Sequence, residues 1–220
     1  PGLAGAVMES RSAARPRQPH GKSPLARPVV LIGAMAVGKT VIGTELARLL
    51  GVPFEDTDQV VVQRHGPVTD IFANHGEHHF RQLEARAVAG VLEGMAAHPG
   101  VVSLGGGAVL DSGTQQLLAG ATVVYLEADR ETVRQRIARN ISRPMLAHPE
   151  DGSVTPAEAA LRRWDELAAV REPVYSRLAT LRLDVRTGSC EELARALAAA
   201  LPTLPGAAAH HDSTEKDSPQ

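Results

Sequence analysis

Short, mainly apolar runs alternate along this chain with longer segments in which apolar residues recur every three or four positions. The short runs have the length and composition of buried strands and lie at 29–32, 52–55, 101–104, 122–126 and 181–185. The longer segments have helical periodicity and lie at 39–50, 58–65, 77–97, 112–119, 130–139, 156–179 and 190–201. This alternation predicts an α/β fold, with a five-stranded parallel sheet covered by helices on both faces.

Two of the expected helices carry capping signals at their starts. Thr155-Pro156-Ala157-Glu158 and Ser189-Cys190-Glu191-Glu192 both place Glu three residues after a hydroxyl side chain. In such a capping box the two side chains satisfy each other's free backbone N–H groups. We therefore expect helices to begin at Pro156 and Cys190.

The two ends of the chain lack this patterning. Residues 1–27 are rich in Pro, Arg, Ser, Gly and Ala, and residues 205–220 are again small and polar. Segments with so little to bury remain disordered, so we expect two disordered tails and one folded domain at 28–204. Met8 is a candidate native start.

Charge, apolar runs and cysteine content limit which partners and which cellular compartment we expect for this protein. The formal net charge is −2 and the pI is near 6.6, which gives no indication of a nucleic-acid partner. Apolar runs fall short of the roughly 20 residues of a membrane span, and residues 1–28 lack a signal-peptide pattern. The single Cys190 excludes an internal disulfide and fits a reducing compartment. We expect a cytoplasmic monomer that acts on a small molecule.

The most specific motif is Gly33-Ala34-Met35-Ala36-Val37-Gly38-Lys39-Thr40, a Gly followed after four residues by Gly-Lys-Thr. An expected strand precedes it and an expected helix follows it, which favours a phosphate-binding loop over a glycine turn with a chance lysine. Backbone N–H groups of such a loop converge on phosphate oxygens. Lys39 would reach the outer phosphates of a nucleoside triphosphate and the Thr40 hydroxyl would ligate Mg²⁺.

Polar residues also follow the second expected strand. Asp56-Thr57-Asp58 would face the phosphate loop across the carboxyl edge of the sheet, where ligands bind in parallel sheets. One carboxylate would hold Mg²⁺ through water and the other would accept a proton from an attacking hydroxyl. The alternative for Asp58 is a helix N-cap, a position that Asp favours.

Three further features are candidates for anion binding. Gly105-Gly106-Gly107 follows the third strand and leaves the backbone open to close approach by a ligand. Arg81 lies four residues after Glu77, so an exposed ion pair is its alternative role. Arg136, Arg139 and Arg143 lead into a Pro- and Gly-containing stretch that we expect to form a mobile lid at about 140–155, although a solvated helix face is the alternative for each arginine.

In this order, the motifs resemble those of the shikimate kinase family across about residues 28–202. Besides the phosphate loop and the Asp-x-Asp pair, the resemblance rests on two spaced motifs and two contiguous segments. The spaced motifs are Ile71-Phe72-x-x-x-Gly76-Glu77-x-x-Phe80-Arg81-x-x-Glu84 and Arg171-x-Pro173-x-Tyr175, and the segments are Leu104-Gly105-Gly106-Gly107-Ala108 and Arg143-Pro144-Met145-Leu146. It implies a three-layer P-loop kinase of the nucleoside-monophosphate-kinase type, which transfers the γ-phosphate of ATP to the 3-hydroxyl of shikimate.

The resemblance also implies a role for each matched residue. Catalysis would fall to Asp58, Lys39 and Arg143, and Mg²⁺ would be held by Thr40 and Asp56. ATP would contact Gly33, Ala36, Val37, Gly38, Lys39, Thr40, Val41, Arg136 and Arg143. Shikimate would contact Asp58, Arg81, Gly105, Gly106, Gly107 and Arg171, with the two arginines on its carboxylate.

Two departures from the family pattern stand out. Ala36 and Val37 occupy positions where the family usually has Gly and a small residue, and the segment between Arg143 and Arg171 is several residues longer than usual. The alternatives are another small-metabolite P-loop kinase, such as gluconate kinase, and a nucleotide-binding regulator without catalysis. The two arginines beside a triple glycine favour shikimate over gluconate, and the retained Lys39 and Asp58 favour an enzyme.

Overall fold

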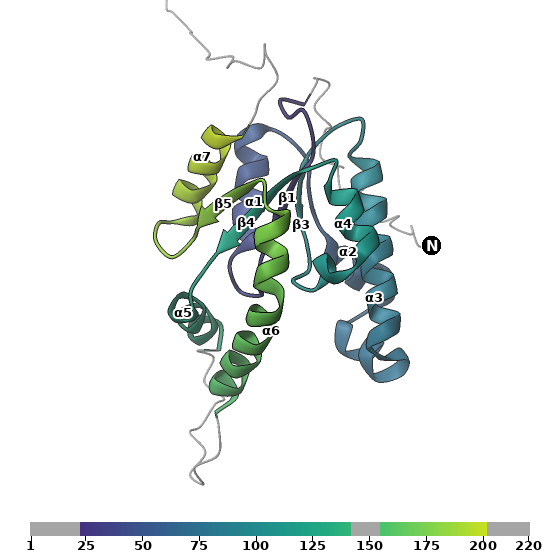
Figure 1. Cartoon of the computed structure of the whole chain (residues 1–220), viewed down its shortest axis with the longest axis vertical. Coiled ribbons are helices and arrows are strands. Elements are labelled where there is room, and N and C mark those ends of the chain that lie inside the picture. Colours follow the sequence, from purple (N-terminus) through teal and green to yellow (C-terminus); the bar gives the residue numbers. More distant parts are fainter. Residues whose placement is uncertain (1–22, 142–154, 202–220) are drawn as a thin grey trace, which may run out of the picture.

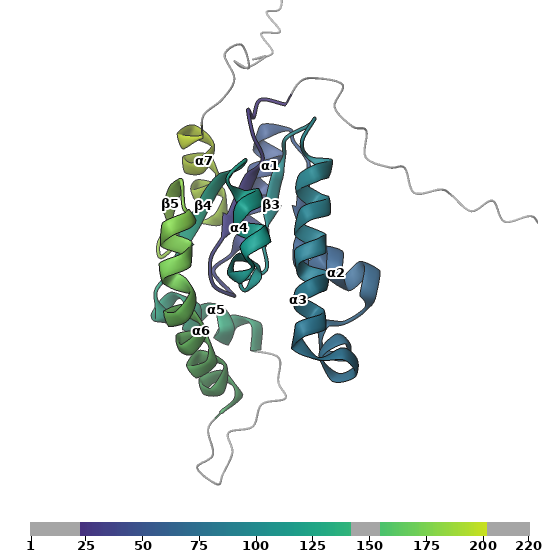
Figure 2. The same cartoon turned by 45° about the vertical axis from the view of Figure 1, so that its right-hand side comes forward.

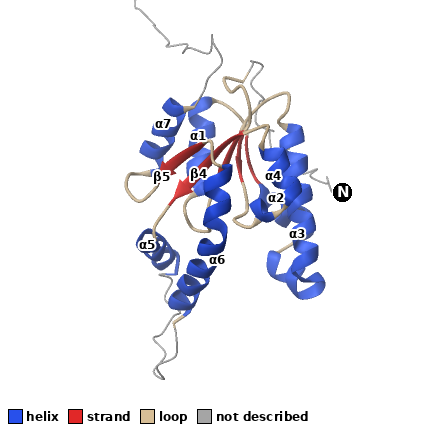
Figure 3. Cartoon of the chain, viewed as in Figure 1, coloured by secondary structure: helices blue, strands red, loops and turns tan. Residues whose placement is uncertain are grey.

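The computed structural model describes residues 23–141 and 155–201, which form an α/β domain around one parallel sheet (Figures 1 and 3). The strands are β1 (Val29–Ile32), β2 (Phe54–Asp56), β3 (Val101–Ser103), β4 (Thr122–Glu127) and β5 (Leu181–Asp184), in the spatial order β2-β3-β1-β4-β5. Every strand pair is parallel. The predicted five-stranded parallel sheet is confirmed.

Helices cover both faces of this sheet. They are α1 (Lys39–Leu50), α2 (Thr57–His65), α3 (Val68–Gly94), α4 (Ser112–Leu118), α5 (Arg130–Ile141), α6 (Pro156–Leu178) and α7 (Cys190–Ala200), with a 3₁₀ turn at Ala108–Leu110. On one face, α1 and α7 pack on a core that includes Leu31 and Val124. On the other, α3, α4 and the end of α6 pack around Val30, Val102 and Val123. Alternate strand residues thus face opposite layers, as the twofold period of a strand requires.

Most predicted element bounds agree with the structure to within two residues, and the differences have local causes. The second strand begins at Phe54 rather than residue 52, because the Val52 N–H donates to Ala47 O and closes the end of α1. Both capping boxes are confirmed: Thr155 pairs with Glu158 and Ser189 pairs with Glu192.

The largest difference concerns α3. The sequence predicts a helix at 77–97, whereas α3 runs from Val68 to Gly94 and bends at Gly76, where φ is 77°. Val68, Ile71 and Phe72 lie at helical spacing, but residues 68–75 are too short a segment to be stable as a helix alone. Ile71 is buried beside Phe80 in a small core with α2. Tertiary packing therefore stabilises a turn of helix that propensity does not predict.

The folded part also begins earlier than residue 28. Leu25 is 2% exposed and packs in the core with Val29 and Leu46, and the Ser23 hydroxyl donates to Pro99 O at 2.8 Å. Residues 23–27, which we expected to belong to the tail, are thus part of the domain. The remainder of both expected tails, and residues 142–154 of the expected lid, lie outside the described residues. In the described ranges, no helix is both long and apolar enough to cross a membrane.

Two pairs of helices extend past the carboxyl ends of the strands. In Figures 1 and 2, α5 and the first half of α6 project on one side, and α2 with the first half of α3 projects on the other. The segments that follow β1, β2 and β3 lie between them, so this edge of the sheet is where a site can form.

The packing of α1 on the sheet gives a test of the fold. A Cβ at Gly43 would come within 2.6 Å of the Phe54 ring and 3.0 Å of Leu31 Cδ1, whereas a Cβ at Gly90 in α3 would meet nothing within 4 Å. Gly43→Ala should lower the free energy of unfolding, because overpacking costs about 1–3 kcal/mol and outweighs the gain in helix propensity of about 1 kcal/mol. Gly90→Ala, the matched control, should raise it. Urea unfolding followed by circular dichroism measures both, and a stabilised Gly43→Ala protein would contradict this packing.

Candidate active site

The strand order brings three candidate motifs to one place. Strands β2, β3 and β1 are neighbours, and the Asp pair, the triple glycine and the phosphate loop follow their respective carboxyl ends. Parallel strands end at the same edge, so these three segments lie next to one another. A Cβ at Gly106 would lie 3.5 Å from Gly33 O and 3.6 Å from Met35 N, which measures how closely the triple glycine and the phosphate loop approach.

The phosphate loop turns at positions with left-handed backbone. Gly33 has φ 142° and Gly38 has φ 97°, as expected for glycine, but Ala36 has φ 62°. Of the described residues, Ala36 is the one non-glycine with positive φ. A Cβ in this region costs about 1–2 kcal/mol. The departure at residue 36 that the sequence reveals is therefore an alanine held in a conformation that favours glycine.

Lys39 is buried within the loop that it serves. Its ammonium donates to Gly33 O at 2.9 Å and to Ala34 O at 2.7 Å. Burial lowers the pKa of Lys39 to about 8, although the carboxylates of Asp58 and Asp56 favour its charged form. A ligand that carries negative charge into the loop would compensate the burial and raise this pKa again.

Asp56 connects the phosphate loop to α2. One carboxylate oxygen accepts from the Thr40 hydroxyl at 2.7 Å, and the other accepts from the backbone N–H groups of Asp58 and Gln59 at 3.0 and 3.2 Å. Asp56 is therefore the N-cap of α2, and the alternative that made Asp58 the cap is wrong. The Thr40 hydroxyl and the Asp56 carboxylate are adjacent hard oxygen groups, which fit Mg²⁺.

Asp58 is left free to face the site. Burial, and then the nearby Asp56 carboxylate, raise the pKa of Asp58 above its ordinary value, while Lys39 and Arg81 oppose the shift. Its Oδ1 lies where a Cβ on Gly105 would approach it to 2.4 Å. The side chain is thus positioned by the Gly105–Gly107 segment, here called the glycine wall, and not by a capping bond.

Each glycine of the triple faces a different charged group. A Cβ at Gly105 would also approach Glu84 Oε1 to 2.5 Å, one at Gly106 would approach Arg171 Nη1 to 3.2 Å, and one at Gly107 would approach Arg81 Nη1 to 2.5 Å. A side chain at any of these positions would displace a charged group, which explains why three consecutive glycines stand here.

Arg81 forms the ion pair that the sequence indicates as its alternative role. It donates to Glu77 at 3.1 Å, the predicted ion pair, and to Glu84 at 2.7 Å. Glu84 is buried, and burial raises its pKa while the hydrogen-bonded Arg81 opposes the shift. The sequence motif that contains Glu84 assigns it no role. Its place on the apolar face of α3, three residues after Arg81, was the available signal.

Arg171 is the most informative residue of the site. It projects from α6 and is only 8% exposed, and among the described residues its Nε is a buried donor with no hydrogen-bond partner. A buried guanidinium N–H without an acceptor is costly. One turn later, the Tyr175 hydroxyl donates to Gly106 O at 2.5 Å, and burial raises the pKa of Tyr175 to about 12. The unpaired Nε fits an anionic ligand that the described residues do not supply.

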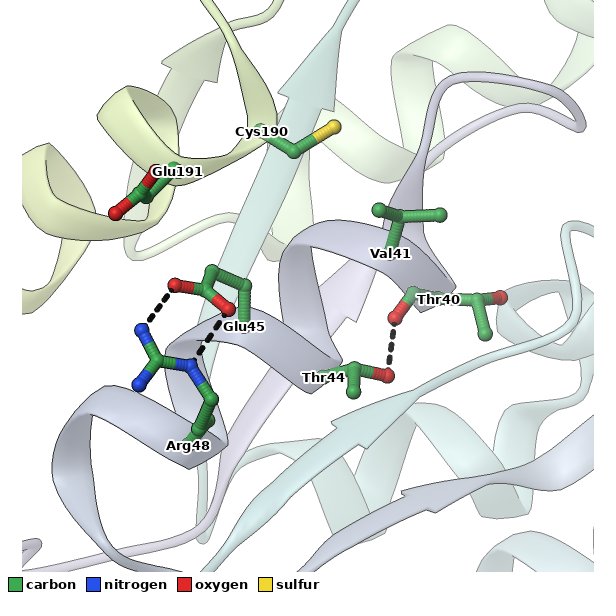
Figure 4. A pocket seen from close by; sticks show the side chains of 7 residues that line it. All are labelled: Thr40, Val41, Thr44, Glu45, Arg48, Cys190 and Glu191. Carbon is green, nitrogen blue, oxygen red and sulfur yellow. Dashed lines mark hydrogen bonds and ion pairs between the residues drawn. The ribbon is translucent and has the colours of Figure 1, made fainter.

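The remaining predicted residues lie farther from the glycine wall. Arg136 donates to Val37 O at 2.5 Å and to Val185 O at 2.8 Å, so it joins the phosphate loop to the segment after β5. Val41 lines an open hollow of about 570 Å³ between α1 and the start of α7, with Cys190 on its other side (Figure 4). Arg143 lies outside the described residues.

A phosphate loop before a helix, an acidic pair at the next strand end and a glycine wall with two arginines define a P-loop kinase that acts on a small molecule. The chain belongs to the shikimate kinase family, whose model matches residues 35–202. The fold and family that the sequence predicts are thus confirmed.

Individual relatives agree with the family model. The chain is 44% identical over 180 residues to a shikimate kinase of Frankia casuarinae, covering 81% of this chain and 74% of the relative. It is 40% identical over 179 residues to a shikimate kinase of Mycobacterium avium, covering 81% and 95%. Among solved structures, shikimate kinase from Acinetobacter baumannii in complex with shikimate superposes with a TM-score of 0.66 at 29% identity, covering 80% of this chain and 92% of that one.

The lowered pKa of Lys39 predicts how nucleotide binding depends on pH. The ammonium form binds phosphate, and in the free protein it is lost as pH rises through about 8. ATP affinity, measured by calorimetry between about pH 7.5 and 9.5, should therefore fall across this range. Lys39→Arg is the control, because guanidinium stays charged throughout. Equal pH dependence in the two proteins would show that Lys39 is not the titrating group.

Proposed function

We propose that this chain transfers the γ-phosphoryl group of ATP to the 3-hydroxyl of shikimate, giving shikimate 3-phosphate and ADP. The observation that carries the acceptor is the buried Arg171, whose Nε has no partner among the described residues. Arg81 lies on the same glycine wall, against Gly107 where Arg171 lies against Gly106. Two guanidinium groups set against adjacent peptides suit the two oxygens of one carboxylate.

The Asp58 carboxylate would act as the base of the transfer. It would take the proton of the 3-hydroxyl while the hydroxyl oxygen bonds to the γ-phosphorus and ADP leaves. Its raised pKa makes it a stronger base than an exposed aspartate. Its position beside Gly105, on the wall that carries both arginines, would place the hydroxyl at the far end of an acceptor whose carboxylate is clamped. Such orientation converts binding energy into rate.

Lys39 and the Thr40–Asp56 pair would serve the nucleotide. In the structure Lys39 binds two loop carbonyls, which ATP would replace with phosphate oxygens. Mg²⁺ held by the Thr40 hydroxyl and, through water, by Asp56 would neutralise phosphate charge when bound. The remaining loop contacts to ATP would come from Gly33, Ala36, Val37, Gly38 and Val41, mostly through backbone N–H groups.

Arg136, the hollow beside α1 and Arg143 would contact other parts of the nucleotide. Arg136, between Val37 O and Val185 O, would lie against adenine, and the hollow in Figure 4 would take part of the nucleoside. Arg143 would reach the phosphates when the segment at 140–155 closes. We further propose that the protein is a cytoplasmic monomer.

Removing the proposed base should abolish turnover without disturbing the nucleotide loop. Asp58→Asn keeps the size of the side chain, and loss of a general base costs ~10²–10⁴ in rate. The Asp58 side chain makes no capping bond, since Asp56 caps α2, so the fold should be retained. Steady-state kinetics and calorimetric ATP binding measure both effects. Turnover within a few-fold of the unsubstituted protein would exclude Asp58 from the mechanism.

The acceptor is tested by following ADP release with shikimate, with gluconate, with a shikimate analogue that lacks the carboxylate, and with no acceptor. Only shikimate should support rapid turnover. Arg171→Ala should lower kcat/KM for shikimate, with ATP affinity unchanged. The lost transition-state stabilisation should be about 2–5 kcal/mol, the cost of leaving a buried anion unpaired. For the analogue, Arg171→Ala should have little effect. Equal turnover of shikimate and the analogue would reject this acceptor, and faster turnover of gluconate would favour the alternative kinase.

A further inference from the structure

Side chains approach the phosphate loop at five consecutive carbonyl groups. Lys39 binds those of Gly33 and Ala34, and Arg136 of α5 binds that of Val37 at 2.5 Å and approaches that of Ala36 at 3.5 Å. The Met35 carbonyl between them accepts from the indole N–H of Trp164 at 3.1 Å. Lys39 is the proposed ligand of phosphate. Once ATP binds, Arg136 and Trp164 are therefore the side chains of this set that still bind the loop carbonyls.

Trp164 is the support that reaches the loop from α6. Its ring is buried in the core with Val37 and Leu161. Beside this ring, between α6, β4 and the loop, is a cavity of about 310 Å³ whose lining includes Ala34, Val37 and Trp164. A loop that borders a cavity has few packing contacts on that side, so a directed hydrogen bond has more influence on its conformation.

The peptide that Trp164 binds is the one that leads into Ala36. A trans peptide is planar, with its carbonyl and its N–H on opposite sides. Holding the Met35 carbonyl toward α6 therefore turns the Ala36 N–H away from α6, to the side where a phosphate loop gathers its donors. Ala36 has φ 62°, a conformation from which alanine, unlike glycine, relaxes readily when nothing holds it.

We propose that Trp164 is a positioning residue of the nucleotide loop: its hydrogen bond to Met35 O holds the loop in its phosphate-binding shape and allows alanine at position 36. The inference rests on the proposed nucleotide binding and deepens it. It also gives α6 a second role. Trp164, Arg171 and Tyr175 are spaced by seven and four residues and lie on one face of the helix, so a single rigid element contacts the phosphate loop and the Gly106 segment together.

The test compares two substitutions on that face that each remove one hydrogen bond and keep an aromatic ring. Trp164→Phe should weaken ATP binding by roughly five- to tenfold, the worth of one such bond, and raise KM for ATP while kcat at saturating ATP changes little. Tyr175→Phe, the matched control, removes the bond to Gly106 O and should leave ATP affinity within about twofold, since its effect falls on the acceptor side.

A third substitution separates positioning from general packing. In an Ala36→Gly background the loop adopts positive φ without strain, so Trp164→Phe should there change ATP affinity by less than about twofold. The proposal is overturned if Trp164→Phe binds ATP as tightly as the unsubstituted protein, or if its effect is the same in both backgrounds. If the unsubstituted protein itself does not bind ATP, the proposed function fails, and the two failures are thus distinguished.

A measurement on the unsubstituted protein covers the case in which Trp164→Phe does not fold. The chain contains one tryptophan, so ¹⁵N-labelled protein gives one indole N–H resonance, which reports this bond alone. The resonance should shift on saturation with ATP and shift less with shikimate alone. A resonance unmoved by saturating ATP, in a protein that calorimetry shows to bind it, would overturn the proposal.

Discussion

The close approach of charged side chains to bare backbone at Gly105–Gly107 is the constraint on which the site depends. Carboxylates from α2 and α3 and guanidinium groups from α3 and α6 all reach this segment, and each occupies space that a Cβ would fill. Any other residue would push at least one charge away from its partners. The wall thus gathers groups from three helices without supplying a functional side chain of its own.

Charges that would be costly alone are stabilised together at this wall. Burial shifts Lys39, Asp58 and Glu84 toward their neutral forms, but each has a neighbour of opposite sign that opposes the shift. Arg81 is paired with Glu84, whereas the Nε of Arg171 has no hydrogen-bond partner in the part of the chain that the structure describes. The site is therefore electrostatically incomplete at one place, and an anionic acceptor would complete it.

Helix α6 organises the side of the site opposite α3. Its face toward the sheet carries Trp164 on the phosphate loop, Arg171 on the glycine wall and Tyr175 on Gly106 O. One rigid helix would thus set the distance between the proposed nucleotide and acceptor sides, a distance that in-line phosphoryl transfer requires to be fixed. The Asp56 carboxylate makes a similar link on the other side, between Thr40 and the start of α2.

The sequence alone determined the parallel sheet, most of the helix starts and the family, because these depend on local periodicity, capping residues and spaced motifs. It also identified Ala36 as a departure, though not its positive φ. Only the tertiary structure decided which carboxylate caps α2, that Glu84 is buried against Arg81, that Leu25 belongs to the core, and that Trp164 binds the phosphate loop. Each of these depends on contacts between residues far apart in the chain or on the direction of one side chain, and a sequence pattern encodes neither. The burial that shifts the pKa of Lys39 is of the same kind, because it arises from the packed surroundings and not from neighbouring residues.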